Sequence, residues 1–306
     1  MSSVKDVAHG SRRNAYTALI LSTLAMIVCF MSWSNFAPLA SQVAEMFNLD
    51  VSQRTLLLAT PVLLGSIMRI PVGILSDRYG GKKVYLILMA FILIPLIMIP
   101  HVHSFGMLLF AALLVGMSGT SFAVGVSYAS VWFPPEQQGL ALGIVSMGNM
   151  GNAVAAMTLP YISKAAGFDS VYYFLIILTV IFGVLFAVFC KEMPVDKSKT
   201  IKGALSVATD SGTWYLSLFY FLTFGLFVAF TNLTPTFLTG MFHYTPVTAG
   251  LYSTLFAFVC TLVRPFCGYL ADRKRPMALL QWVFVAIVIF AIWIMLSFHN
   301  QFMFIA

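Results

Sequence analysis

The stretch LLGSIMRIPVGILSDRYGGKK, Leu63 to Lys83, decides the fold of this protein. Most of it has the composition of a helix that lies in lipid, yet it contains one arginine, Arg69. A charge near the middle of a bilayer is costly, so an arginine at that depth usually has a function. The stretch ends with the basic residues Arg78, Lys82 and Lys83. It therefore predicts a membrane-spanning helix followed by a basic loop.

Similar apolar stretches recur along the whole chain. Hydrophobic residues make up 60% of the sequence and charged residues only 9%, which excludes an ordinary soluble domain. Crossing about 30 Å of hydrocarbon takes about twenty apolar residues in a helix, and these runs lack the alternation of barrel strands. The sequence predicts an all-α membrane protein with nine spans: 15–39, 55–76, 84–100, 106–132, 138–160, 171–190, 212–239, 246–271 and 277–298.

Basic residues predict the orientation of these spans. They gather before the first span, after the second, between the sixth and seventh, and after the eighth, and these positions all fall on one side. The other side has only Arg54 and Lys164. The positive-inside rule then predicts a multi-pass protein of the cytoplasmic (inner) membrane with its N-terminus in the cytoplasm. The net charge of +7 follows from this asymmetry and does not indicate nucleic-acid binding.

The opening stretch has a second copy in the chain. The sequence RIPVGILSDR at 69–78 returns as RPFCGYLADR at 264–273, without a gap. This repeat predicts two related units. We expect a six-helix bundle over 1–190, a cytoplasmic linker over 191–211, and a partial second bundle over 212–306 with helices 7–9 and the start of helix 10. We also expect the chain to be a fragment, or the product of a truncated gene, that lacks about three helices.

The repeated stretch resembles a motif of the major facilitator superfamily. The residues G-x-L-S-D-R-x-G-G-K-K, Gly73 to Lys83, are similar to the loop between helices 2 and 3 of that superfamily, and GYLADRKR at 268–275 is similar to its degenerate copy. The resemblance implies the superfamily fold, with about nine of its twelve helices in this chain. It also implies a charge network at the cytoplasmic mouth that differs between inward- and outward-open states. The expected gating residues are Gly73, Asp77, Arg78, Gly268, Asp272 and Arg273.

Arg69 and Arg264 are expected to bind an anion. Each lies eight residues before the aspartate of its copy, or about 12 Å from the helix end at 1.5 Å per residue. In two pseudo-symmetric halves they would face each other across the central cavity. None of the ten acidic residues lies inside a span, so the sequence offers no counter-charge. Guanidinium groups suit planar oxyanions. The alternative is that an arginine bonds backbone carbonyls opened by Pro71 or Pro265.

Further candidates fall at the same depth in other spans. They are two glycines that expose backbone, one neutral amide and three aromatic rings, namely Gly148, Gly151, Asn149, Phe122, Tyr220 and Phe224. Glycines three residues apart are more often a packing face than a site, and an aromatic residue in a membrane helix usually faces lipid or the core. The spacing alone therefore leaves both alternatives open.

Several of these segments together resemble the nitrate/nitrite porter family (NarK-like) of the superfamily. They are GNMGN in the fifth span, SFAVG followed by WFPPEQQGLALG at the fourth and fifth, and Y-x-x-T-F-G in the seventh. The resemblance implies a nitrate or nitrite ion between the two arginines. The rings of Phe122 and Phe224 would sandwich the ion, and Tyr220 and Asn149 would hydrogen-bond its oxygens. Asn152 departs from the pattern, since a smaller residue is expected there.

The predicted function is secondary transport of nitrate, nitrite or both by alternating access of the two bundles. The spans contain no group that titrates near pH 7, which favours nitrate-for-nitrite exchange over proton symport. The alternatives are a porter of another small anion, such as formate or a short carboxylate, and a non-transporting fragment or sensor. No span holds a set of residues typical of an enzyme. We expect no cofactor or metal, a monomer, and only lipid and the anion as partners.

Overall fold

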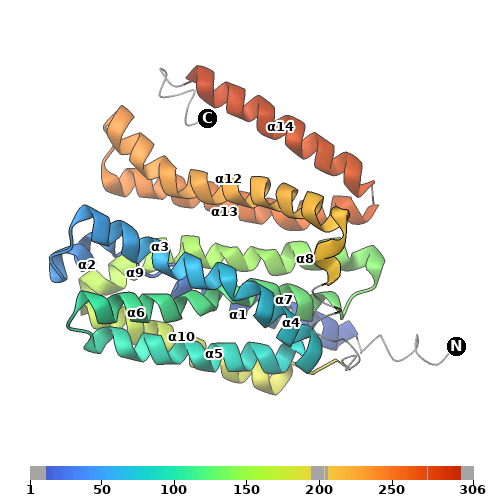
Figure 1. Ribbon diagram of the computed structural model, residues 1–306, viewed down its shortest axis with the longest axis horizontal. Helices are drawn as coiled ribbons and strands as arrows, with labels where there is room; N and C mark the ends of the chain where they lie inside the picture. The colour runs from blue at the N-terminus through green and yellow to red at the C-terminus, as the bar shows by residue number, and fades with distance from the viewer. Residues whose placement is uncertain (1–11, 194–202, 204–205, 274, 298–306) are drawn as a thin grey trace, which may run out of the picture.

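The computed structural model describes residues 12–193, 203, 206–273 and 275–297 (Figure 1). In this part of the chain all regular secondary structure is helical, and nine helical segments are long and apolar enough to cross a membrane. The predicted all-α fold with nine spans is confirmed, and the chain is a multi-pass membrane protein. Much of the predicted linker and the predicted start of helix 10 lie outside the described residues.

The first six spans form one bundle, the lower and larger part of Figure 1. Its helices are α1 (Arg12–Trp33), α2 (Ala40–Met46), α3 (Val51–Ile67), α4 (Arg69–Tyr79), α5 (Gly81–Met98), η1 (Ile99–His101), α6 (Phe105–Val115), η2 (Gly116–Thr120), α7 (Ser121–Ser130), η3 (Pro135–Gln137), α8 (Gln138–Ser146), η4 (Met147–Asn149), α9 (Met150–Ala166) and α10 (Phe168–Phe189). We call this unit the first bundle.

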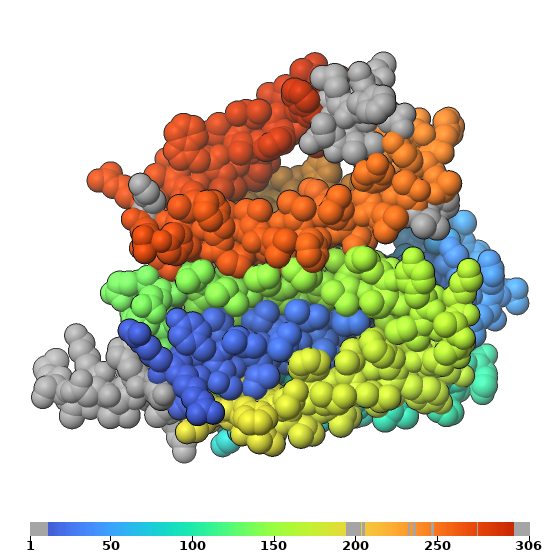
Figure 2. Space-filling model, turned by 180° about the vertical axis from the view of Figure 1, so that it is seen from behind, coloured from blue at the N-terminus to red at the C-terminus, as the bar shows by residue number. Residues whose placement is uncertain are grey.

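The remaining described helices follow η5 (Ser206–Thr209) and form the second unit. They are α12 (Ser211–Phe242), α13 (Pro246–Arg273) and α14 (Pro276–Ser297). Figure 1 shows α12 and α13 side by side over the first bundle, with α14 on their far side. The space-filling view from behind shows α13 lying along the segment coloured for residues 138–166, which is α8 to α9 (Figure 2). This contact between the two units positions the candidate site.

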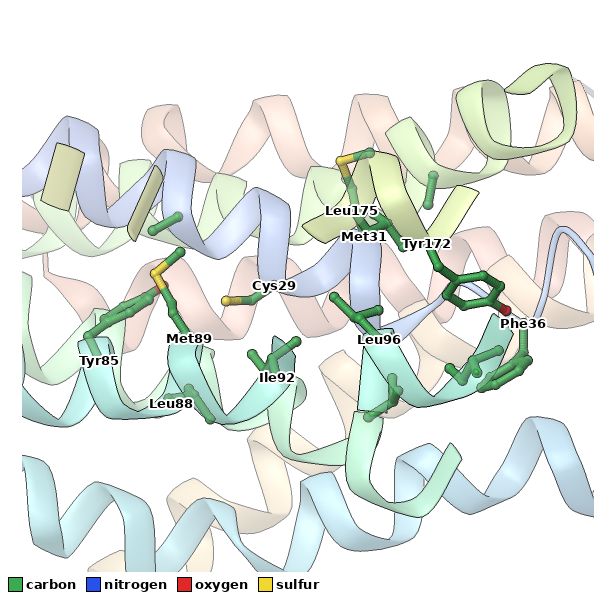
Figure 3. Close-up of a cluster of buried hydrophobic side chains, with 14 of the residues drawn as sticks. Cys29, Met31, Phe36, Tyr85, Leu88, Met89, Ile92, Leu96, Tyr172 and Leu175 are labelled. Atoms are coloured by element: carbon green, nitrogen blue, oxygen red, sulfur yellow. The ribbon is translucent and has the colours of Figure 1, made fainter. Parts of the chain in front are cut away.

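The core of the first bundle lies between α1, α5 and α10 (Figure 3). It is built from large apolar side chains and contains three buried tyrosines whose hydroxyls are satisfied, including Tyr128, which donates to the carbonyl of Lys191 at 2.7 Å. Tyr85 donates to the carbonyl of Ser22 at 3.3 Å, and Tyr172 donates to the side chain of Asn35 at 3.3 Å. Cys29 packs among them as a small buried residue. The α5 helix of this core also packs against α4, the helix that begins at Arg69.

Three spans of the first bundle are interrupted in the middle. The second span breaks at Met68, between α3 and α4, while the fourth and fifth contain the 3₁₀ segments η2 and η4. Pro71 contributes to the first break because it has no N–H to donate to the preceding turn. A 3₁₀ segment inside a longer helix leaves backbone carbonyls in altered positions and often marks a functional site. The apolar pattern of the sequence does not reveal these breaks.

Candidate functional site

Both arginines point at carbonyls of these interrupted spans. Arg69 is the first residue of α4, and its Nη2 donates to the carbonyl of Gly119 in η2 at 3.4 Å. Arg264 lies in α13, and its Nη1 donates to the carbonyl of Ser146, directly before η4, at 3.3 Å. Both distances are longer than an ideal N–H···O bond, so these contacts are weak. The carbonyls belong to other spans, not to the turns before Pro71 or Pro265.

Asn149 provides a second acceptor for Arg264. Its side chain is 2% exposed, and with the amide oriented to fit its neighbours the oxygen accepts from Nη1 and Nη2 of Arg264. An amide that accepts through its oxygen presents its NH₂ group in another direction. The structure thus places Asn149 on the arginine, and leaves its two N–H donors for another acceptor.

Aromatic rings from both units surround the guanidinium groups. The Cζ atom of Arg69 lies 5.5 Å from the ring centre of Phe122 in α7 and 5.9 Å from that of Phe224 in α12. The Cζ atom of Arg264 lies 5.3 Å from the ring centre of Phe227, also in α12. These distances are typical of cation–π contacts. The first bundle and the second unit therefore share one site.

Tyr220 belongs to the aromatic cluster beside Arg69. Its ring stacks on Phe224, with 5.2 Å between centres and 5° between planes, and lies 6.3 Å from Phe122. The two rings that it contacts, Phe122 and Phe224, are the rings beside the guanidinium of Arg69. The four residues that the resemblance implied around the anion are thus next to the arginines, in one place.

The two positive charges lack an acidic partner in the described part of the chain. Every hydrogen bond that the guanidinium groups make there goes to a carbonyl or an amide, all of them neutral acceptors. The Nε atom of Arg69 is buried and has no acceptor. An unsatisfied charged donor in a protein interior costs free energy. The site therefore has the capacity to bind an anion.

The two candidate glycines face α1. A Cβ atom added to Gly151 would lie 2.8 Å from the Cβ of Phe30, and one added to Gly148 would lie 2.6 Å from the Cβ of Met26. Both therefore allow close packing of the fifth span on the first, which was the alternative to a binding role. Their contact with an anion stays a prediction. Nearby, Asn152 leaves its side-chain oxygen buried and without a hydrogen bond.

The copies of the gating motif make different contacts. Asp272 accepts from the backbone N–H of Gly139 at 2.7 Å and of Leu140 at 2.8 Å, so it caps the start of α8 across the two units. Asp77 accepts from the hydroxyl of Ser127 at 2.6 Å, within the first bundle. In the described residues both aspartates thus accept from neutral donors, and the expected charge network stays a prediction. An uncapped helix start attracts a carboxylate because its N–H groups and dipole are positive.

The other motif residues lie beside these aspartates. The Cζ atoms of Arg78 and Arg273 lie over tyrosine rings of their own helices, Tyr79 at 5.5 Å and Tyr269 at 4.3 Å. Gly268 approaches α8 so closely that a Cβ atom on its neighbour Gly139 would be 2.5 Å from its carbonyl. Gly73 meets only Ala123, at 3.8 Å from an added Cβ.

Two residues were not among the candidates from the sequence: Phe227, which lies beside Arg264, and Glu192, which bonds the start of α5. Phe227 lies seven residues after Tyr220 and three after Phe224, which is one face of a helix; its spacing was a usable signal. Glu192 accepts from the backbone N–H of Lys82 at 3.2 Å and of Lys83 at 3.1 Å. Only the fold reveals this contact, since the residues lie far apart in the sequence.

Comparisons with known proteins agree on the class. Residues 22–306 match the Major Facilitator Superfamily. The chain is 35% identical to the nitrite extrusion protein of Bacillus subtilis over 89% of its length and 69% of that protein. It is 33% identical to the "Probable nitrate transporter NarT" of Staphylococcus epidermidis, over 94% of its length and 74% of that protein. The human organic anion transporter MFSD10 has a similar fold, with a TM-score of 0.65 at 13% identity, over 85% of this chain and 72% of that one.

Proposed function

The chain belongs to the Major Facilitator Superfamily and, within it, to the nitrate/nitrite porter family, and on this premise we propose that it carries nitrate, nitrite or both across the cytoplasmic membrane. One observation carries the proposal. Arg69 of the first bundle and Arg264 of α13 both lie beside phenylalanine rings of α12, and their hydrogen bonds in the described structure go to neutral acceptors. A small anion that enters between them would supply the missing negative charge.

The surroundings of the arginines favour a flat ion. Phe122 and Phe224 flank Arg69, and Tyr220 stacks parallel to Phe224 at 5.2 Å. Ring faces leave room for a planar guest, while donors at its edge can bond its oxygens in the plane. The buried Nε of Arg69 and the NH₂ group of Asn149 are such donors. Tetrahedral sulfate or phosphate would fit the same space poorly.

The proposed transport cycle is alternating access of the two units around the anion. With the N-terminus in the cytoplasm, Asp77 and Asp272 lie at the cytoplasmic end. There α13 contacts α8 through Gly139 and Gly268, and Asp272 caps α8. Opening toward the cytoplasm would require this contact to separate. The same two units would then close at the opposite end.

Exchange is the proposed mode of coupling. A proton symporter usually needs a titratable group near the path, and the hydrogen bonds of the two arginines lead to backbone and amide oxygens instead. Two charges without a counter-ion would oppose closure around an empty site. Nitrate moving one way and nitrite the other would keep the site occupied in both transitions.

Anion binding to the purified full chain tests the proposal. Isothermal titration would compare nitrate and nitrite with formate, as a second flat anion, and with sulfate, as a tetrahedral one. We expect nitrate or nitrite to bind more tightly than formate, and sulfate not to bind. Tighter binding of formate would instead support the alternative function, a porter of formate or short carboxylates. Equal binding of sulfate and nitrate would contradict a slot between rings.

A further inference from the structure

We propose that Phe227 is a positioning residue that fixes the Arg264 guanidinium and thereby sets the affinity for the anion. The inference rests on the proposed function. The ring centre of Phe227 lies 5.3 Å from the Cζ atom of Arg264. A ring face at this distance stabilises the positive charge without using any of its N–H donors. Those donors stay available for oxygen acceptors in the plane of the guanidinium.

The ring of Phe227 is itself held on two sides. Phe224 lies 6.1 Å away on α12, and Phe256 lies 6.3 Å away on α13 with 24° between the ring planes. One turn beyond, Ser253 of α13 donates to the carbonyl of Thr231 of α12 at 2.5 Å. The two helices are thus tied together next to the ring. Phe227 can therefore hold the arginine in a defined place rather than follow its motion.

The contact between Phe227 and Arg264 lies within one unit, whereas the hydrogen bonds of Arg264 join the two units. Ser146 and Asn149, which accept from Arg264, belong to the first bundle, whereas Phe227 and Arg264 belong to the second unit. When the two units move relative to each other, the hydrogen bonds must lengthen or change. The ring contact can persist because both partners move together.

The first bundle contains a corresponding pair. Phe122 lies 5.5 Å from Arg69, and both belong to that bundle. Each arginine thus has one ring from its own unit, in addition to acceptors on interrupted spans. Phe227 thus has the same relation to Arg264 that Phe122 has to Arg69. It distinguishes Phe227 from Phe256, which contacts the ring but neither guanidinium group in the described structure.

Fluorinated phenylalanines test the inference, because stepwise fluorination weakens the negative ring face with little change in shape. Phenylalanine with one, two and three fluorine atoms would be incorporated at position 227 of the full chain, and at 256 as the matched control. The dissociation constant for nitrate would be measured by isothermal titration. We expect binding to weaken with each fluorine at 227, to about tenfold overall, as a cation–π contact of ordinary strength implies. We expect no trend at 256.

Two further variants separate positioning from packing. Phe227→Leu keeps an apolar side chain but removes the ring face, so we expect weaker nitrate binding with an unchanged Tm; Phe227→Trp should restore the affinity. If the dissociation constant for nitrate did not change with fluorination at 227, or changed equally at 227 and 256, the inference would be overturned. Nitrate binding by the wild type would still support the proposed function in that case. Absence of nitrate binding in the wild type would overturn the proposed function itself.

Discussion

The side-chain oxygen of Asn149 accepts hydrogen bonds from the guanidinium of Arg264, although the two residues belong to different units of the protein. The amide oxygen thereby orients the arginine, and under the proposed function the NH₂ group of Asn149 donates to an anion oxygen. The side chain at position 149 must be neutral for this arrangement. A carboxylate in the same place would bind Arg264 more strongly and would repel an anion.

Substitutions of Asn149 separate these two effects. We expect Asn149→Ala to weaken nitrate binding by about 1.5–3 kcal/mol, or roughly ten- to hundredfold, because a hydrogen bond to a charged group is lost. Asn149→Asp should nearly abolish binding, since it neutralises one of the two positive charges. Titration calorimetry on both variants measures the difference. Wild-type affinity in the Asp variant would be incompatible with electrostatic recognition.

Asp272 is expected to stabilise the contact between α13 and the start of α8. Removing a helix cap typically costs about 0.5–2 kcal/mol, so Asp272→Ala should shift the protein toward a state in which this end is open. Spin labels on the ends of α8 and α13 would report the distance between the two helices. Asp210→Ala is the control, because Asp210 caps its own helix at Gly212. An unchanged distance distribution in Asp272→Ala would argue against a gating role.

The loop between α4 and α5 depends on Gly80. Its φ of 98° and ψ of 137° suit glycine, and a Cβ atom there would lie 2.5 Å from the carboxyl carbon of Glu192. We expect Gly80→Ala to lower the unfolding free energy by about 1–3 kcal/mol. Gly106→Ala is the matched control, since a Cβ at that position meets nothing within 4 Å. Thermal unfolding in detergent gives both values, and equal Tm values would show that the loop tolerates a side chain.

Much of this arrangement could be predicted from the sequence, because charge is conspicuous in an apolar helix. Arg69 and Arg264 stood out through their depth and their place in a repeat, and the structure brings the predicted Asn149, Phe122, Tyr220 and Phe224 next to them. A similar depth in each span made these residues candidates, and the resemblance to the porter family implied their place beside the arginines.

Other features of the site depend on contacts between distant residues, which no local sequence pattern reveals. The breaks at η2 and η4 turn the carbonyls of Gly119 and Ser146 toward the arginines, and this follows from packing between spans. The partner of Asp272 is a helix start 133 residues away. Phe227 is one of 28 phenylalanines, so composition alone could not distinguish it.

Exchange has its own test in proteoliposomes. Uptake of labelled nitrate would be compared between vesicles loaded with nitrite and vesicles without it, with a pH-sensitive dye inside. We expect internal nitrite to accelerate uptake severalfold without acidification, because an occupied site allows the two units to close. Equal uptake in both preparations, accompanied by proton entry, would establish symport instead.

The central claim is that a single anion lies between the guanidinium groups of Arg69 and Arg264. The most direct measurement is the nitrate dissociation constant of Arg69→Lys and Arg264→Lys, determined by titration calorimetry beside the wild type. An ammonium keeps the charge but cannot form the planar pair of N–H bonds. We predict one ion per wild-type protein and, in each variant, binding weakened on the order of a hundredfold or more. Wild-type affinity in either lysine variant would contradict the account.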